Sequence, residues 1–232
     1  MIRVLAAARL HSTNPLLTIG IPWGIVGLSF AINLALWGTI GIGDESPEAF
    51  TGGVLSLYVT VLVVFVQSVT SLLPFAMGMS LSRRTFYAGT ALAALVVALV
   101  YGAALAVLTA VEGATGGWGV GLYFWAPGGF DVGNTALQVV VSGAPMLAAA
   151  SLGVAIGVVV KRWGSTGLWT LVVATLALSG TVAVLVSWQR AWGDVGSWLT
   201  AQSAVTLAVV LPVVLALATA ALSFAGIRRV VP

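Results

Sequence analysis

The sequence predicts an all-α membrane protein with six transmembrane helices and with both the N and C termini in the cytoplasm. Hydrophobic residues make up 60% of the 232-residue chain and charged residues only 6%, whereas a soluble domain carries about a quarter charged residues. Six apolar stretches are each long enough to cross about 30 Å of hydrocarbon, for which a helix needs roughly 20 residues. The charged residues fall in the gaps between these stretches.

The distribution of charge predicts the topology. The acidic residues all lie in gaps on one side of the expected membrane: Asp44, Glu45, Glu48, Glu112, Asp131 and Asp194. Arg190 is the one basic residue on that side. The other basic residues lie on the opposite side: Arg3, Arg9, Arg83, Arg84, Lys161, Arg162, Arg228 and Arg229. Because Lys and Arg next to a span resist translocation, we expect this basic side to be cytoplasmic.

The elements follow from the apolar stretches and from the residues that interrupt them. We expect a cytoplasmic arm over residues 1–14, a transmembrane domain over 15–225 and a cytoplasmic tail over 226–232. Asn14-Pro15 is typical of a helix start. The expected spans cover residues 15–40, 54–79, 89–111, 137–160, 165–188 and 202–225. Pro74 is expected to kink the second span or to mark a break in it.

Several kinds of chemistry have no residues to support them. His11, on the arm, is the only histidine, cysteine is absent, and no phosphate-binding motif surrounds Lys161, the only lysine. We therefore expect no catalytic residue, no metal site and no cofactor bound by this chain, and we do not expect an enzyme. The spans lack a central charged residue, which argues against proton-coupled carriers and ion pumps. The basic residues sit at span ends, where they orient helices and meet lipid headgroups, so they do not imply nucleic acid.

The link between the second and third spans is the most informative positive feature. It consists of Ser80, Leu81, Ser82, Arg83, Arg84, Thr85, Phe86 and Tyr87. Ser82 could cap a short helix lying in the membrane interface, and Phe86 and Tyr87 could anchor that helix or insert into a partner. The alternative is a plain positive-inside anchor.

The longest outer segment, residues 112–136, is rich in glycine and aromatic residues. Its stretch from Leu122 to Trp125 is apolar enough to dip back into the interface. One interpretation is an outer gate formed by Glu112, Trp118 and Trp125, with Glu112 capping the outer end of the third span. The alternative is an ordinary interfacial loop.

Small and polar residues within the spans indicate where helices meet. Alanine and glycine recur every four residues in the third span, at Ala94, Ala98, Gly102, Ala106 and Ala110, and in the fourth, at Ala149, Gly153 and Gly157. We expect these stripes to pack the third and fourth spans together, and a dimer seam is the alternative. Asn33 and Gln67 either form interhelical hydrogen bonds or face a substrate path.

Taken together, these features resemble the permease subunits of type-2 ATP-binding-cassette exporters, particularly the short actinobacterial ones. The resemblance rests on the basic arm, the six spans, residues 78–86 between the second and third spans, residues 112–119, and residues 161–164. It implies that Ser80 to Tyr87 form the coupling helix and that the arm is an elbow helix. It also implies that two permease chains pair around the substrate path, and that each binds one ATPase chain carrying ATP and Mg²⁺. In better-known members the large outer elaboration lies between the fifth and sixth spans, whereas here the longest outer segment follows the third.

The sequence therefore leads us to expect a multi-pass permease of the bacterial cytoplasmic membrane. Its substrate would be amphipathic or hydrophobic, such as a drug, a lipid or a peptide-like compound, because the spans carry so little charge. Its partners would be two ATPase subunits, a second permease chain (an identical copy or a sister subunit) and the lipid bilayer. The alternative is an ATP-independent facilitator, or an immunity or assembly subunit with no transport of its own.

Overall fold

A computed structural model describes residues 2–41 and 51–228, and the regular elements of this part are all helices. The elements run in the order α1 (Ile2–Arg9), η1 (Leu10–Ser12), η2 (Leu16–Gly20), α2 (Ile21–Ile40), α4 (Leu55–Gln67), η3 (Ser68–Leu72), α5 (Leu73–Gly78), α6 (Arg83–Ala114), η4 (Gly117–Gly121), η5 (Pro127–Gly129), α7 (Thr135–Trp188), α8 (Trp192–Ala201), η6 (Thr206–Val210) and α9 (Leu211–Ile227). Three acidic residues of the first outer loop, Asp44, Glu45 and Glu48, lie outside the described residues, as does Arg229.

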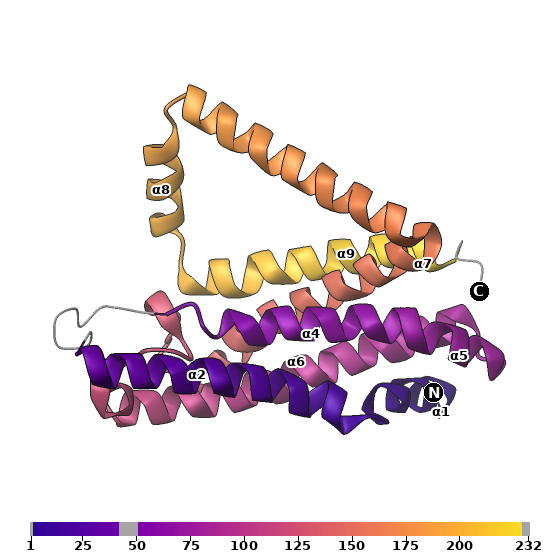
Figure 1. Cartoon of the computed structure of the whole chain (residues 1–232), viewed down its shortest axis with the longest axis horizontal. Coiled ribbons are helices and arrows are strands. Elements are labelled where there is room, and N and C mark those ends of the chain that lie inside the picture. Colours follow the sequence, from indigo (N-terminus) through magenta and orange to yellow (C-terminus); the bar gives the residue numbers. More distant parts are fainter. Residues whose placement is uncertain (1, 42–50, 229–232) are drawn as a thin grey trace.

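Helices α2, α4, α6 and α9 run roughly side by side (Figure 1). The arm, the turn between α5 and α6, the bend in α7 and the end of α9 lie at one end of the molecule, which we call the basic end. The turns that lead into η4, α7 and α8 lie at the opposite, acidic end. The alternation of charge along the sequence thus corresponds to an alternation of ends in space.

Within the described residues, five helices are long and apolar enough to cross a membrane: Leu16–Ile40, Leu55–Gly78, Arg83–Ala114, Thr135–Trp188 and Thr206–Ile227. The longest of them, α7, is broken at Gly164, whose φ of 64° and ψ of −153° belong to a region that is essentially restricted to glycine. Two limbs leave this point in different directions, a first limb (135–163) and a second limb (165–188) (Figure 1). They correspond to the expected fourth and fifth spans.

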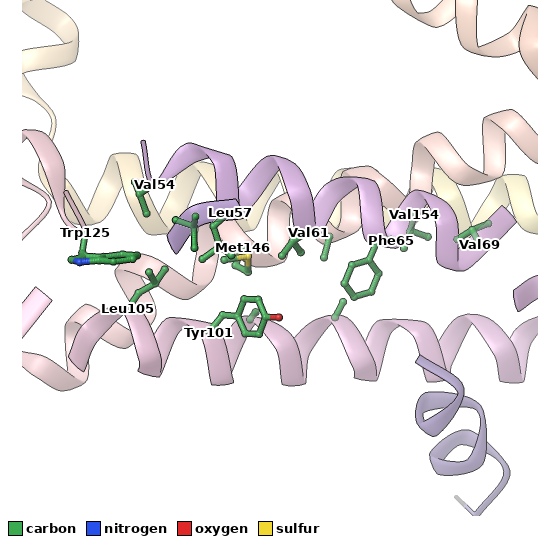
Figure 2. Close-up of a cluster of buried hydrophobic side chains, with 14 of the residues drawn as sticks. Val54, Leu57, Val61, Phe65, Val69, Tyr101, Leu105, Trp125, Met146 and Val154 are labelled. Carbon is green, nitrogen blue, oxygen red and sulfur yellow. The ribbon is translucent and has the colours of Figure 1, made fainter. Parts of the chain in front are cut away.

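The core lies between α4, α6 and the first limb of α7. Figure 2 shows apolar side chains of α4 facing Tyr101 and Leu105 of α6 along the length of the bundle. The labelled members of this cluster are buried: Val54, Leu57, Val61, Phe65, Val69, Tyr101, Leu105, Trp125, Met146 and Val154. Since lipid is as apolar as these side chains, close packing rather than exclusion of water stabilises such a core.

Glycines bring α6 and α7 into backbone contact. A Cβ atom added to Gly102 would lie 2.5 Å from the carbonyl oxygen of Val139, and one added to Gly143 would lie 2.8 Å from that of Ala98. Neither position tolerates a side chain without separating the helices. The expected packing of the third and fourth spans is therefore confirmed at Gly102.

The stripe of the fourth span faces a different neighbour from the one expected. A Cβ atom at Gly153 would lie 2.3 Å from the carbonyl oxygen of Leu62, and one at Gly157 would lie 2.7 Å from Cβ of Val69. Both contacts are with the second span, so the expectation that Gly153 and Gly157 pack on the third span is wrong. Small residues permit a close approach, but they do not specify which helix makes it.

Three prolines each follow a wide helical turn. The π-helical turns η2, η3 and η6 directly precede helices whose second residues are Pro22, Pro74 and Pro212. A proline ring clashes with the carbonyl group four residues earlier, and a π turn relieves the clash by widening the backbone. The predicted disturbance at Pro74 thus takes the form of a π turn, and the helix continues beyond it.

The second limb of α7, α8 and α9 form an open triangular frame beside the bundle (Figure 1). The second limb and α8 contain no buried residue, and large side chains such as Leu176, Leu178 and Val184 are 66–68% exposed. The first limb, by contrast, is packed against both α4 and α6. Part of the molecule therefore lacks intrachain packing partners.

Candidate functional site

The link between α5 and α6, at the basic end, is shorter than expected. Ser82 is an N-cap, since its side chain accepts a hydrogen bond from the amide of Thr85 at 3.1 Å. The helix that it caps is α6 itself, so Arg83 to Tyr87 form the first turns of the span rather than a separate interfacial helix. Ser80 adopts the left-handed backbone conformation with φ of 60°, which is uncommon for a residue with a side chain.

Two aromatic residues of the link face inward. Phe86 is fully buried, and its ring centroid lies 6.1 Å from that of His11 on the arm. Tyr87 donates a hydrogen bond to the carbonyl oxygen of Ala220 in α9 at 2.6 Å. Both side chains thus make contacts inside this chain, Phe86 with the arm and Tyr87 with α9, and Tyr87 remains half-buried.

The remaining link residues form a small polar surface. Ser80, Ser82 and Arg84 are exposed. Arg83 is half-buried and donates a hydrogen bond to the carbonyl oxygen of Arg228 at 3.1 Å, which ties the start of α6 to the end of α9. Arg84 is therefore the exposed charge of the link.

Gln67 lies near the middle of the Leu55–Gly78 helix with its side chain exposed. Its amide group makes no hydrogen bond with another described residue, whereas an amide in hydrocarbon needs a partner. Thr60 and Ser71 lie seven residues before it and four after it, spacings that place all three on one face. We call Thr60, Gln67 and Ser71 the polar stripe.

Asn33 is not part of this face. Its amide group donates to the carbonyl oxygen of Ser29 at 2.8 Å and accepts from the hydroxyl of Thr51 at 2.8 Å. Ser29 lies in α2, and Thr51 lies just before α4. The structure thus satisfies Asn33 locally and does not bring it together with Gln67.

Glu112 holds the outer segment onto the bundle. It is 2% exposed, and its carboxylate accepts hydrogen bonds from the amide of Phe124 at 2.8 Å, the amide of Trp125 at 3.3 Å and Nε1 of Trp118 at 3.2 Å. A carboxylate is unfavourable at the negative end of the helix dipole, and it has no proton to offer the last helical carbonyl groups. Glu112 therefore binds loop donors, and the expected capping of the end of the third span is wrong.

Trp118 and the residues Leu122, Phe124 and Trp125 surround these hydrogen bonds, and we call these four residues the aromatic cap. Leu122 and Phe124 are fully buried, and the ring of Phe30 in α2 lies 5.0–5.3 Å from the rings of the three aromatic members. The cap closes the acidic end of the bundle between α2, α4 and α6 (Figure 2 shows Trp125 beside Val54 and Leu105). Glu112, Trp118 and Trp125, which the sequence analysis grouped as an outer gate, are brought together.

The sequence analysis missed the role of His11. The ring is 8% exposed, and its Nε2 atom lies 3.0 Å from the hydroxyl of Thr90 in α6. That hydroxyl donates its proton to the carbonyl oxygen of Phe86, so it accepts from Nε2–H of the neutral ring. A lone histidine beside a helix start carries no sequence signal for such a contact.

Within residues 2–41 and 51–228, no group of three histidine, aspartate or glutamate side chains is placed to hold a metal ion. Comparison of the chain with protein-family models, with curated proteins and with solved structures gives no match. The geometry of the link, the polar stripe and the aromatic cap is therefore the basis on which a function can be inferred.

Proposed function

We propose that this chain is the membrane subunit of an ATP-driven exporter of the bacterial cytoplasmic membrane, and that a separate ATPase subunit supplies the energy. In this proposal each limb of α7 crosses the membrane, which gives six spans with both termini on the cytoplasmic side. The substrate is amphipathic or hydrophobic.

The polar stripe is the observation that carries the proposal. An unpaired amide at the middle of a membrane-crossing helix is unfavourable against lipid, and such groups mark paths for substrates or contacts between subunits. Thr60, Gln67 and Ser71 supply hydrogen-bonding groups without charge, on a face otherwise formed by apolar residues such as Val63. A path of this polarity suits a neutral or amphipathic compound better than a polyanion.

The open frame supports the presence of a second permease chain. The second limb and α8 lack partners within this chain, and small and hydroxylated residues such as Thr175, Ser179 and Gly180 occur along the limb. Such residues allow close helix contacts in lipid. A path between two copies would have the polar stripe and the second limb as candidate walls.

The link supports coupling to an ATPase. Arg84 is exposed at the basic end, on the first turn of α6, and the polar surface around it is small. A push on this turn is carried directly along α6, which is continuous over 32 residues from Arg83 in the link to Ala114, just beyond Glu112. Movement at the basic end thus has a rigid connection to the aromatic cap, which we assign as the outer gate.

Charge reversal at the link tests this proposal. The tagged full chain, or its Arg84→Glu variant, is purified from its native host in mild detergent, and the co-purifying ATPase is quantified by mass spectrometry. We expect Arg84→Glu to lower ATPase recovery at least severalfold and to abolish export, because an exposed charge at the docking surface is reversed.

Arg162→Glu is the matched control, since Arg162 also lies at the basic end, beside Trp163 in the bend of α7 and outside the link. This control is expected to retain both the ATPase and export. Retention of both by Arg84→Glu would show that the link is not the coupling element.

A further inference from the structure

A cavity of about 440 Å³ lies under the N-terminal arm, between the arm, α4 and α6. Its volume falls within the range of roughly 300–1,000 Å³ that is typical of small-molecule sites. The arm forms one wall, and the first turn of the first span, with Thr18 and Ile19, closes one side.

The arm is fixed in place, so this wall is a built part of the fold. A Cβ atom at Gly89 would lie 2.6 Å from Cβ of Ala7 and 2.8 Å from the amide nitrogen of Ala8, which shows how closely the arm approaches α6. His11 adds its hydrogen bond to Thr90 and a stacked contact with Phe65, at 6.0 Å between ring centroids. The space between the arm and the spans is therefore defined by specific contacts.

The cavity opens sideways rather than to the end of the bundle. The residues at its rim are at least half exposed, at 50% for Leu5, 54% for Ile19, 50% for Val96 and 58% for Val100. These are apolar side chains on the outer face of the bundle. An occupant would enter from the surrounding lipid.

The length of the cavity along α6 fits one leaflet. Its α6 wall extends from Leu92 to Tyr101, which are nine steps of about 1.5 Å apart along the helix, or about 14 Å. Half of a hydrocarbon core of about 30 Å is close to this length. The walls from α4, η3 and α6 are apolar except for Ser68 in η3 and the hydroxyl of Tyr101, which donate to backbone carbonyl groups within the protein.

Charge is confined to the end formed by the arm. Arg9 is the charged side chain among the residues that line the cavity, and it is exposed. The Nδ1 atom of His11 is buried and has no hydrogen-bond partner among the described residues. Protonation of Nδ1 would bury an unpaired N–H group, so the ring of the docked arm is neutral. The cavity thus combines one cation at the basic end with a leaflet-deep apolar slot.

We propose that this cavity binds an anionic phospholipid from the leaflet at the basic end, with one acyl chain between α4 and α6 and the headgroup at Arg9. The lipid is a bound constituent of the subunit rather than the transported substrate. The proposal does not depend on an ATPase partner, because the site is formed within one chain.

Native mass spectrometry of the full chain tests the proposal. The protein is purified in mild detergent, freed of lipid and titrated with dioleoylphosphatidylglycerol or with dioleoylphosphatidylcholine. We expect one tightly bound lipid, with the anionic lipid preferred by about fivefold, as expected from about 1 kcal/mol per basic residue near an anionic headgroup.

Two substitutions test the headgroup contact and the acyl-chain slot separately. Arg9→Gln should reduce the ratio of the affinities for the anionic and the zwitterionic lipid to about one. Val96→Trp, at the exposed rim, should remove tight binding of both lipids. The matched controls are Arg3→Gln, on the same arm but not lining the cavity, and Val107→Trp, 58% exposed on α6 beyond the cavity. Both controls should behave as the unchanged protein does.

The proposal is overturned if Arg9→Gln keeps the preference, if Arg3→Gln loses it equally, or if Val96→Trp retains the tight lipid. Because residues 9 and 96 are exposed, both variants are expected to fold, and size-exclusion chromatography verifies this. A chain that purifies without any ATPase but retains the lipid preference would overturn the proposed function and support the lipid site.

Discussion

At the residue scale, Glu112 is the most deeply buried of the described carboxylates. It is nearly inaccessible at the end of α6, and its stability there rests on donors from the outer segment, the amides of Phe124 and Trp125 and the indole of Trp118. Hydrogen bonds to a charged group contribute more than neutral ones. We therefore expect this one side chain to hold the aromatic cap closed.

Glu112→Gln should open the cap. The amide side chain places N–H groups where the carboxylate accepts hydrogen bonds, so donors from Phe124 or Trp125 would face another donor. We expect amide hydrogen exchange over residues 122–126 to become about tenfold faster, in line with a loss of about 1–3 kcal/mol.

Asp131→Asn is the control for this substitution, because Asp131 is an exposed carboxylate of the same outer segment. It should leave exchange over residues 122–126 unchanged. Equal exchange rates in Glu112→Gln and in the unchanged protein would mean that the cap is held by aromatic packing alone.

His11 makes the docking of the arm dependent on pH. Burial lowers the pKa of His11 from 6.5 to about 4. The docked arm therefore binds fewer protons than the detached arm between these values, so docking is strongest above pH 6.5 and weakens as the pH falls toward 4. The full effect is up to about 3 kcal/mol, since one pKa unit corresponds to about 1.36 kcal/mol.

Electron–electron double resonance measures this dependence. The chain has no cysteine, so spin labels at Ala6→Cys and Ala91→Cys, both exposed, report the distance between the arm and α6. We expect one narrow distance at pH 7.5 and a broadened distribution at pH 4.5. His11→Gln should remove the pH dependence, and a broadening that persists in this variant would assign it to another group.

At the element scale, α7 depends on a single residue for its reversal of direction. Gly164→Ala should destabilise the protein by about 1–3 kcal/mol, because its backbone conformation is closed to residues with a side chain. Gly180→Ala, in the open second limb with no atom near its added methyl group, should be neutral or stabilising by up to about 1 kcal/mol. Thermal unfolding in one detergent compares the two, and equal midpoints would contradict the assigned role of Gly164.

The span positions could be predicted from sequence because the length of an apolar stretch is a direct physical requirement of the bilayer. The observed Leu16–Ile40 and Leu55–Gly78 differ from the expected 15–40 and 54–79 by at most one residue at either end. Arg83–Ala114 extends beyond the expected 89–111 at both ends, and Thr206–Ile227 begins four residues later than the expected 202–225. Thr135–Trp188 covers two expected spans in one helix that is broken at Gly164. Helix α8 was missed because Trp192–Ala201 is short and carries Gly193 and Gly196, which disfavour a helix in isolation.

Tertiary contacts of the candidate sites could not be predicted in the same way. The sequence placed Glu112, Trp118 and Trp125 in one outer segment as a possible gate, and the structure joins them by hydrogen bonds to the Glu112 carboxylate, which the sequence did not indicate. It did not indicate that Phe86 points inward or that Gly153 faces α4, because periodicity defines a face of a helix and not the neighbour against which it packs.

At the scale of the whole molecule, the bundle and the frame are packed very differently. The bundle of α2, α4, α6 and the first limb of α7 has a continuous core, whereas the second limb and α8 contain no buried residue and stand apart from the bundle (Figure 1). A second copy or a sister chain that packs against the frame would cover the second limb. We therefore expect two permease chains in the functional complex.

The composition of the complex purified from the native host tests the central claim most directly. The tagged full chain is extracted at several detergent strengths, and the masses of intact complexes are determined. We expect two permease chains with two copies of an ATPase that carries a phosphate-binding loop, and ATP-dependent export after reconstitution. Recovery of this chain without an ATPase at every detergent strength would contradict the proposed exporter and favour an ATP-independent facilitator or an immunity subunit.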